Sequence, residues 1–511
     1  MNDVIVVGAR CAGSPISMLL ARRGYRVLIL DRDTFPSDMQ MSTHFVHQRG
    51  IACLSRWGLR DQVVATKSPP VGRFDIDVGP FTLSGSGPAV DSEGFAFAPR
   101  RVLLDDLLVR AATRSGAELR EGCFVDGLLF DDGRVTGVTG HTAQGTRFSE
   151  SAPLVIGADG PSSRVASSAR AEEYNAKPAL QGTAWIYWEG SLLDHFELHV
   201  RDLEAIFAFP TSGSCTLIGA YWSIDRFREA RAQIEPSYLE VLRRAAPDLA
   251  DRAASTKRAD DRIYLGSTRN FFRKAHGPGW ALLGDAHYKK DPCTAQGITD
   301  AFCDAEALAD AIDKGLSGKC DLAAVIAEYE RSRVAWALPF YELTCQLATL
   351  APPPPEMLAL YVALQGNQQD IDRFIGLITE ATSPTDFFAP DNVQRILRRS
   401  QVSNSGRGAQ LGIGPCESAV DSLLICRASR CVVRKPSPQV VDDAQVSKGA
   451  YRRPERCYRG SAACCTPASL LCTSRTSGSS GSACSQSLSA AVSSLRIVAE
   501  SPLCSARTAA T

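Results

Sequence analysis

The chain has 511 residues, with 56 basic and 56 acidic side chains and 44% hydrophobic residues. This length exceeds one ordinary domain and can bury a large core. Zero net charge argues against nucleic acid or an anionic membrane as a partner. No apolar run reaches the roughly 18 residues that a membrane-spanning helix needs. Because the first strand begins by residue 4, leaving no room for a signal peptide, and the cysteines before residue 400 are scattered, we expect a cytoplasmic protein.

The N-terminal segment predicts a βαβ unit. An apolar run at residues 4–7 indicates a buried strand, and a helix over residues 16–23 and a second strand over residues 25–30 follow. Such a unit aims a helix N-terminus at a pyrophosphate, with Gly8 and Gly13 in the turn.

Two side chains of this unit are candidate ligands. Asp31 follows the second strand, at the spacing of the carboxylate that binds the hydroxyls of an adenosine ribose. The middle glycine of the G-x-G-x-x-G pattern is replaced by Arg10. A guanidinium beside a diphosphate adds charge-assisted hydrogen bonds, and we expect Arg10 to make them.

Two later segments have a similar form, an apolar strand followed by glycine and aspartate. The first reads VIGADGPSSR at residues 155–164. The second reads WALLGDA at residues 280–286 and continues as DPCTAQG at residues 291–297. Apolar residues then recur at helical spacing, which predicts a helix that starts near Gly297.

The three segments, in this order, resemble those of the single-component FAD-dependent aromatic hydroxylases, whose relatives include geranylgeranyl reductases and flavin halogenases. The resemblance implies that Asp159 and Gly160 touch both FAD and the entering nicotinamide cofactor. It also implies that Gly284 and Asp285 hold the ribityl chain of the flavin.

The same resemblance assigns the loop that contains Pro292 and Gly297 to the flavin ring. The helix that starts at Gly297 would point its positive end at the pyrimidine ring, favouring the anionic reduced flavin. Relatives also carry an arginine at a helix start that reaches the FAD phosphates, and either Arg100 or Arg101 can serve here. The alternative for both arginines is a solvated helix end.

Two residues are candidate catalytic groups. His44 lies in a loop that relatives bring alongside the isoalloxazine ring, where a histidine can carry protons or contact substrate. Asp291 belongs to the charged stretch after Asp285, which could handle protons or receive the phosphates of the nicotinamide cofactor. The alternative is a solvated turn.

The expected fold class is α/β: a Rossmann-like FAD-binding domain with an interleaved antiparallel-sheet substrate domain, C-terminal helices and a disordered tail. The pattern places the FAD-binding domain at residues 1–70, 99–180 and 267–345 and the substrate domain at residues 71–98 and 181–266. Helices are expected over residues 329–350 and 357–379. The pattern assigns residues 346–400 to a C-terminal helical segment.

These observations predict an FAD-dependent oxidoreductase, and a monooxygenase in particular. NADPH or NADH would bind transiently and reduce FAD, and O₂ would then form a flavin hydroperoxide that oxygenates a small organic substrate. The alternatives are an FAD-dependent reductase of prenyl double bonds and a catalytically dead nucleotide-binding protein. Neither the lysine motif nor the tryptophan-rich stretch of flavin halogenases is evident, and we predict no metal site.

The composition changes at residue 401. Residues 401–511 contain no Phe, Trp, His or Met but nine of the 17 cysteines, with 13 basic against six acidic side chains. Such a segment cannot bury enough apolar surface to offset its ordering entropy, so we predict a disordered tail. A cysteine-rich metal module is the alternative, although the spacing is irregular and no histidine is present.

A chain shortened to residues 1–400 is therefore expected to fold and to retain flavin. Flavin absorbance after gel filtration checks this expectation, and limited proteolysis of the full chain should cut the tail first. A shortened chain that precipitates without FAD, or a tail that resists protease, would show that the tail packs on the body.

Overall fold

The computed structural model describes residues 2–408, and side chains as far as residue 399. The predicted tail at residues 401–511 lies almost wholly outside the described residues. The last helix, α14 (Pro390–Gly408), continues past the predicted boundary at residue 400. None of the described helices is both long and apolar enough to cross a membrane.

A six-stranded sheet forms the first layer of the fold, in the order β17-β18-β9-β1-β2-β5. All neighbours pair in parallel except β17, which pairs antiparallel with β18. The strands are β1 (Val4–Val7), β2 (Val27–Leu30), β5 (Glu118–Arg120), β9 (Leu154–Gly157), β17 (His276–Gly277) and β18 (Trp280–Leu282). The central strands are entirely apolar and fully buried, as parallel strands covered on both faces require.

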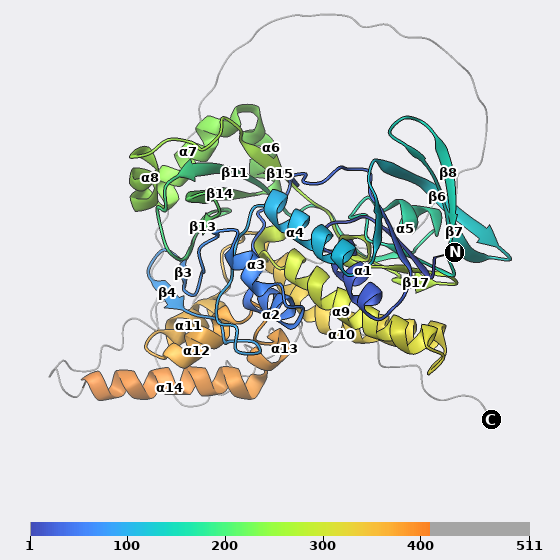
Figure 1. The fold of residues 1–511 in the computed structure, drawn as a ribbon. Helices are drawn as coiled ribbons and strands as arrows, with labels where there is room; N and C mark the ends of the chain where they lie inside the picture. Colours follow the sequence, from blue (N-terminus) through green and yellow to red (C-terminus); the bar gives the residue numbers. More distant parts are fainter. Residues whose placement is uncertain (1, 409–511) are drawn as a thin grey trace, which may run out of the picture. The chain divides into compact units, whose positions relative to one another are not determined.

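Helices cover one face of this sheet and a small antiparallel sheet covers the other (Figure 1). The helical layer contains α1 (Gly13–Arg22), α2 (Gln48–Arg56), α4 (Arg101–Arg114), α9 (Gly297–Leu316) and α10 (Leu322–Leu347). The opposite layer contains β6 (Cys123–Asp131), β7 (Arg134–Thr142) and β8 (Arg147–Ser151). The predicted Rossmann-like unit is therefore confirmed.

A seven-stranded sheet forms the second part of the described chain, in the order β15-β11-β14-β13-β12-β3-β4. The strands are β3 (Phe74–Asp77), β4 (Thr82–Gly85), β11 (Gln181–Glu189), β12 (Phe196–Arg201), β13 (Glu204–Thr211), β14 (Cys215–Ser223) and β15 (Tyr264–Gly266). Strands β11 to β15 pair antiparallel, as predicted, whereas β12 pairs in parallel with β3. The segment at residues 71–98 thus joins this sheet through β3.

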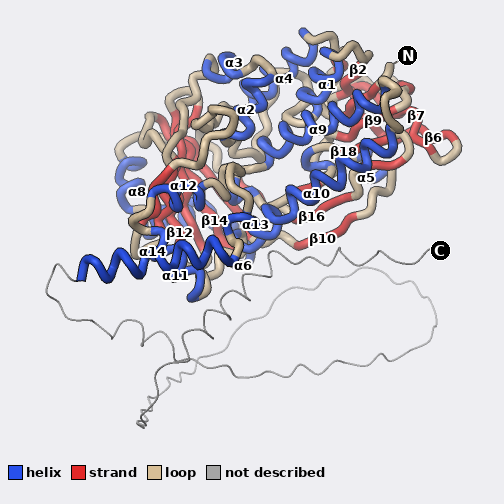
Figure 2. Tube along the Cα trace, turned by 90° about the horizontal axis from the view of Figure 1, so that it is seen from below, coloured by secondary structure: helices blue, strands red, loops and turns tan. Residues whose placement is uncertain are grey.

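Side chains alternate along the strands of the second sheet, so each face has its own core. One face packs on α7 (Ile234–Ala245) and α8 (Pro247–Ala254). The other face packs on Phe45 and on the C-terminal helices α11 (Pro355–Leu364), α12 (Gln368–Ile375), α13 (Pro384–Phe387) and α14 (Figure 2). The two sheets and the C-terminal helices match the predicted fold class.

The remaining described elements connect these layers. They are α3 (Arg60–Val64), α5 (Arg164–Ser168), β10 (Glu173–Lys177), α6 (Ile224–Ala230), η1 (Arg231–Gln233), β16 (Asn270–Arg273), η2 (Gly284–Ala286), β19 (Tyr288–Lys289) and η3 (Pro292–Thr294). Strands β10, β16 and β19 form a small antiparallel sheet of their own.

One predicted helix is wrong in extent. The single helix expected over residues 357–379 is two helices, α11 and α12, with a break at Gly366, whose φ is 82°. Glycine adopts this left-handed conformation without the steric cost that other residues carry. The Asn367 side chain then caps the second helix by accepting a hydrogen bond from the backbone N–H of Asp370.

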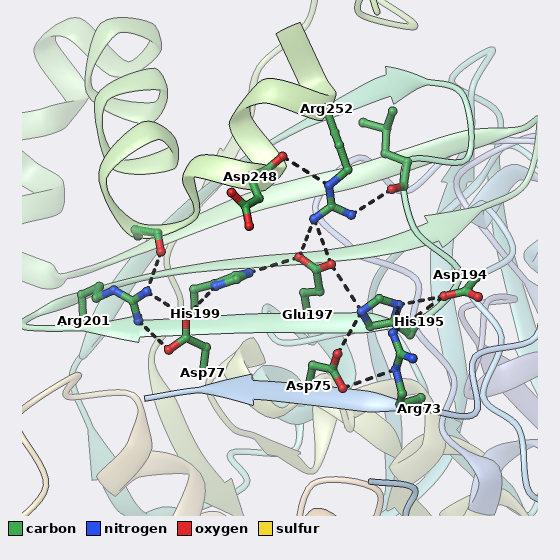
Figure 3. Close-up of polar contacts among 12 residues, drawn as sticks. Arg73, Asp75, Asp77, Asp194, His195, Glu197, His199, Arg201, Asp248 and Arg252 are labelled. Carbon is green, nitrogen blue, oxygen red and sulfur yellow. Dashed lines mark hydrogen bonds and ion pairs between the residues drawn. The ribbon is translucent and has the colours of Figure 1, made fainter. Parts of the chain in front are cut away.

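A polar ladder joins β3 to β12 on the face turned away from the aromatic core (Figure 3). Glu197 lies opposite Asp75, and His199 lies opposite Asp77. His199 bridges Asp77 and Glu197 at 3.0 and 3.1 Å. Because β3 and β12 lie far apart in the sequence, these contacts hold a separate segment against the substrate sheet.

His195 lies at one end of this ladder, between three carboxylates and one cation. Its Nε2 lies 3.1 Å from Asp75 and 3.3 Å from Glu197, and its Nδ1 lies 2.8 Å from both Asp194 and the Arg73 guanidinium. Burial lowers the pKa of His195, but hydrogen bonds to Asp75, Glu197 and Asp194 outweigh it and raise the pKa from 6.5 to about 10. The folded state therefore favours the imidazolium.

This raised pKa predicts a pH-dependent contribution to folding stability. The folded pKa exceeds the unfolded one, so the contribution is complete below pH 6.5 and is lost as the pH rises towards 10. His195→Gln should therefore reduce the free energy of unfolding at low pH and much less near pH 10. Denaturant titrations of both proteins across this range measure the difference, and a pH-independent difference would contradict the assignment.

Candidate active site

Three loops meet at one edge of the parallel sheet. Val7, Gly157 and Leu282 lie at the same level on the adjacent strands β1, β9 and β18. Since these strands run in parallel, their carboxyl ends share one edge, where α/β proteins bind ligands. The three sequence segments that define the predicted flavin site therefore leave the sheet side by side.

Glycines let these loops approach closely. A Cβ on Gly8, whose φ is 100°, would lie 2.5 Å from the carbonyl oxygen of Ala158. A Cβ on Gly13 would lie 1.8 Å from the carbonyl oxygen of Gly8, and one on Gly284 would lie 3.0 Å from the Ala12 Cβ. The first loop therefore contacts both of the others. A side chain at Gly8 would push the first loop away from the second, and one at Gly13 would strike the first loop itself.

The start of α1 is suited to an anion. Its N-cap residue, Ala12, has no side chain that could accept a hydrogen bond from the first turn. The N–H groups and the positive end of the dipole at such a helix start attract phosphate. The glycine turn and this helix start therefore fit the diphosphate of a dinucleotide.

The Arg10 side chain is part of a network of ion pairs and is not free at the start of α1. Its guanidinium lies 2.8 Å from Asp33 and 2.6 Å from Asp105. Asp105 is fully buried and also binds Arg101 at 2.9 Å. Two carboxylates thus balance the charges of Arg10 and Arg101. This weighs against the prediction that the Arg10 guanidinium serves only to bind the diphosphate.

Asp31 lies at the end of β2, as predicted, and is buried. Its Oδ2 accepts a hydrogen bond from the Ala9 N–H at 2.6 Å, and its Oδ1 accepts one from the Asp33 N–H at 2.8 Å. Burial raises the pKa of Asp31, although both backbone hydrogen bonds oppose that rise. Asp31 therefore holds the glycine loop in place, and its bond to an adenosine ribose stays a prediction.

Asp159 and Gly160 form the turn after β9. Asp159 Oδ1 accepts a hydrogen bond from the Ser163 hydroxyl at 2.6 Å, and Oδ2 accepts one from the Arg164 N–H at 2.6 Å. Gly160 has a φ of 79°, and a Cβ there would meet no atom within 4 Å, so the backbone conformation explains glycine at this position. Asp159 thus shapes the turn and the start of α5, and its contact with FAD stays a prediction.

Asp285 follows β18 and lies in the short helix η2. Its side chain is 31% exposed and pairs with Lys289 at 2.6 Å, and its contact with the ribityl chain stays a prediction. The next lysine, Lys290, is buried and lies 2.9 Å from Asp300 and 3.3 Å from Glu380. Lys290 is therefore not part of a solvated turn, which was one of the alternatives for this stretch, and its charge is paired within the protein.

The loop after η2 carries a buried carboxyl group. Asp291 Oδ1 accepts hydrogen bonds from Gln181 Nε2 at 2.5 Å and from the Cys293 N–H at 3.1 Å. Its Oδ2 is buried without a hydrogen-bond partner in the protein, and burial raises the pKa of Asp291 to about 7. A group with this pKa can exchange a proton near neutral pH.

Pro292 begins the short helix η3 in this loop, and Gly297 begins α9 as predicted. Gln296, the N-cap of α9, makes no side-chain cap to the first turn. Its amide instead donates to the carbonyl oxygens of Leu377 and Ile378 at 3.0 and 2.9 Å. The flavin contacts of Pro292 and Gly297 stay predictions.

His44 is buried and adopts a φ of 50°. Its Nδ1 lies 3.1 Å from the Ala98 carbonyl oxygen and its Nε2 lies 2.9 Å from the Tyr187 hydroxyl. Since a carbonyl only accepts, Nδ1 donates to Ala98 and Nε2 accepts from Tyr187 in the neutral ring. Burial and the nearby charges of Arg100 and Arg101 lower the pKa of His44 to about 3, so it is neutral.

The two candidate arginines have different surroundings. The Arg100 guanidinium stacks over the Tyr187 ring at 4.0 Å, on the substrate sheet. Arg101 is buried on Asp105, and its pKa is raised, because the carboxylate of Asp105 outweighs the effect of burial. Neither arginine therefore lies at a solvated helix end, which was the alternative considered for both.

One face of β11 looks towards this site. Trp185 and Tyr187 belong to the aromatic core of that face, and Gln181 and Thr183 alternate onto the same side. Gln181 Oε1, Thr183 Oγ1 and Trp185 Nε1 are buried with no hydrogen-bond partner in the protein. Buried polar atoms are normally paired, so this row can receive polar atoms of a ligand.

Sequence reasoning missed Asp105, Gln181 and Tyr187. Each lies within an otherwise regular helix or strand, with no motif around it. The one available signal was Asp105 itself, a carboxylate among the apolar residues of a helix. Among residues 2–399 no group of three or more His, Cys, Asp or Glu side chains could hold a metal ion.

Known proteins similar to this chain include several flavoenzymes. The chain is 22% identical to the tryptophan 2-halogenase of Chondromyces crocatus over 68% of its own length and 69% of that protein. It is 26% identical to mitochondrial squalene epoxidase 2 of Arabidopsis thaliana over 60% of its length and 53% of that protein. It is 33% identical to the rifampicin monooxygenase of Streptomyces venezuelae over 32% of its length and 33% of that protein. The chain thus spans less than two thirds of the last two relatives.

Solved structures share the fold. The myxobacterial chondrochloren halogenase matches with a TM-score of 0.63 and 22% identity, covering 74% of this chain and 95% of that one. A flavin-dependent brominase matches with a TM-score of 0.66 and 17% identity, covering 80% and 99%. Residues 1–339, which contain all three loops, match the family model described as FAD binding domain. The chain therefore belongs to the FAD-binding-domain family and is a flavin-dependent oxidoreductase of the monooxygenase and halogenase group.

Proposed function

We propose that this protein is an NAD(P)H-dependent FAD monooxygenase that oxygenates a small organic molecule. The observation that carries the proposal is the convergence of three loops at one sheet edge, beside a second sheet with an aromatic face. The names of its relatives support oxygen chemistry, since they include a rifampicin monooxygenase and squalene epoxidases. The halogenase lysine motif is not evident in the sequence, which favours oxygenation over halogenation.

Different residues at the sheet edge would bind different parts of FAD. The start of α1 would take the diphosphate, Asp31 the adenosine ribose and Asp285 the ribityl chain. Bound FAD supplies hydride acceptance and oxygen activation, which the protein orients and shields from water. The chain has one dinucleotide fingerprint only, so NADPH or NADH would bind transiently at the same domain.

The face of β11 favours a substrate that combines an apolar body with polar groups. Trp185 and Tyr187 offer aromatic surface, while Gln181 and Thr183 offer polar atoms that lack a partner in the protein. The Tyr187 hydroxyl donates to His44, so its oxygen lone pairs can accept a hydrogen bond from a substrate N–H or O–H. A neutral, fixed His44 is then a positioning residue for Tyr187.

A prenyl reductase is the second candidate. The chain is 27% identical to a digeranylgeranylglycerophospholipid reductase of Methanopyrus kandleri over 320 residues, which cover 74% of that protein. The unpartnered polar atoms along β11 disfavour a long hydrocarbon substrate, because a hydrocarbon would leave them unpaired.

Oxygen uptake separates the candidates. Purified protein with FAD and NADPH or NADH should consume O₂, and consumption should rise when a panel of small aromatic compounds contains a substrate. Flavin reduction without oxygen uptake, together with anaerobic reduction of a prenyl lipid, would indicate the reductase instead. Protein that binds FAD but is never reduced would indicate a catalytically dead relative.

Asp285→Ala should weaken FAD binding. Hydrogen bonds to a charged group contribute roughly 1.5–3 kcal/mol each, so we expect a loss of about one to two decades in affinity. Fluorescence titration of the apoprotein with FAD measures the change. Asp251→Ala, at an exposed position on α8, is the matched control and should bind FAD as the unsubstituted protein does. Equal affinity of both variants would remove Asp285 from the site.

Asp291→Asn should slow turnover while FAD remains bound. General acid–base groups contribute about 10²- to 10⁴-fold to rate, and a fall of this size is expected. The pKa of Asp291, raised by burial to about 7, predicts a step in the pH–rate profile near pH 7 that the variant lacks. Steady-state kinetics across pH, normalised to FAD content, checks both effects. An unchanged step in Asp291→Asn would assign it to another group.

A further inference from the structure

Two thiols from different helices face each other away from the loops of the candidate site. Cys53 lies on α2 and Cys303 on α9, and their sulfur atoms are 3.8 Å apart. Cys53 is fully buried and Cys303 is partly exposed. Both are free thiols in the structure.

Charged groups surround the pair unevenly. Arg56 Nη2 donates to Cys53 Sγ at 3.2 Å, and the Glu306 carboxylate lies 3.5 Å from the same sulfur. The Arg49 guanidinium is fixed by stacking at 4.4 Å over the Trp336 ring. The hydrogen bond from Cys53 and the charge of Arg49 lower the pKa of Cys303 against the effect of burial, whereas the pKa of Cys53 is raised.

This asymmetry gives the two sulfurs different roles. A thiolate is the reactive form of cysteine, and cations beside it stabilise that form. Cys303 is the more exposed residue of the pair, so it is the thiol that an oxidant reaches first, and the fully buried Cys53 is the thiol that resolves the oxidised product. A disulfide needs the sulfurs at about 2.05 Å, so the two thiols must approach further from their present contact distance of 3.8 Å.

We propose that Cys53 and Cys303 are an oxidation site that forms a disulfide between α2 and α9. With hydrogen peroxide as oxidant, the Cys303 thiolate attacks one oxygen, the O–O bond breaks, and a sulfenic acid and hydroxide form. Cys53 then attacks the Cys303 sulfur, its proton leaves with the departing hydroxyl as water, and the S–S bond forms. The hydroxide takes up the proton that Cys303 released on forming its thiolate, so two thiols lose two electrons in total and the peroxide is reduced to two waters.

The cross-link would act on elements that border the candidate site. His47 immediately precedes α2, and its Nε2 lies 2.9 Å from the Thr294 carbonyl oxygen in the loop before α9. Gly50 on α2 faces Thr299 on α9 so closely that a Cβ there would lie 2.9 Å from the Thr299 hydroxyl. A bond between the two helices therefore fixes the segment that carries His44 relative to the Asp291 loop.

Peptide mapping of the full chain tests the proposal. Protein treated with hydrogen peroxide is alkylated, digested without reductant and analysed by mass spectrometry. The expected result is a linked pair of peptides containing Cys53 and Cys303 that separates after reduction. Links that join Cys303 to another cysteine, or Cys303 oxidised to sulfinic acid with Cys53 still alkylated, would overturn the proposal.

Variants separate the two roles. Cys53→Ser should abolish the linked pair and leave Cys303 as sulfenic or sulfinic acid, because no resolving thiol remains. Cys303→Ser should leave Cys53 reduced, since its pKa is raised. Cys345→Ser, at a buried cysteine on α10, is the matched control and should preserve the link. If a variant folds poorly, peptide mapping of the unsubstituted protein still tests whether the Cys53–Cys303 disulfide forms.

Discussion

The register of β1, β9 and β18 is the constraint on which the site depends. Parallel pairing places Val7, Gly157 and Leu282 at one level, so the residues that follow them meet although they lie far apart in the sequence. Only glycine at positions 8 and 13 lets the first loop pack on itself and on Ala158. Any shift of one strand would separate Asp159 and Asp285 from the start of α1.

The charged side chains at this edge of the sheet pair with one another. Asp105 is fully buried and pairs with both Arg10 and Arg101, while Asp33 takes a second contact from Arg10. A buried carboxylate is costly unless it is paired, so these arginines are required where they stand. The N-terminus of α1 would consequently be the main attraction for a bound diphosphate, with the arginines supporting the loop.

Much of the fold followed from sequence patterns. Apolar runs before Gly8, Gly157 and Gly284 predicted the three strands, and helical spacing predicted α9 from Gly297. Contacts between segments that lie far apart in the chain could not be predicted from these patterns. Gln181 lies in an alternating strand and its bond to Asp291 depends on two chain segments that are 110 residues apart. Lys290 belongs to the charged stretch for which a solvated turn was the alternative, yet it is buried and pairs with Asp300 and Glu380. Sequence spacing does not show which segments of the chain meet. Gly366 broke a predicted helix for a local reason, its positive φ.

The central claim is that the three loops form an FAD site, and the flavin content of purified protein tests it most directly. The full chain, purified with FAD present and then freed of excess cofactor, should carry the visible absorbance of oxidised flavin at close to one FAD per chain. Gly8→Ala should lose that absorbance, because its Cβ would strike the Ala158 carbonyl oxygen, while Gly145→Ala, in an open surface turn, should retain it. Folded protein without flavin, or equal occupancy in both variants, would contradict the account.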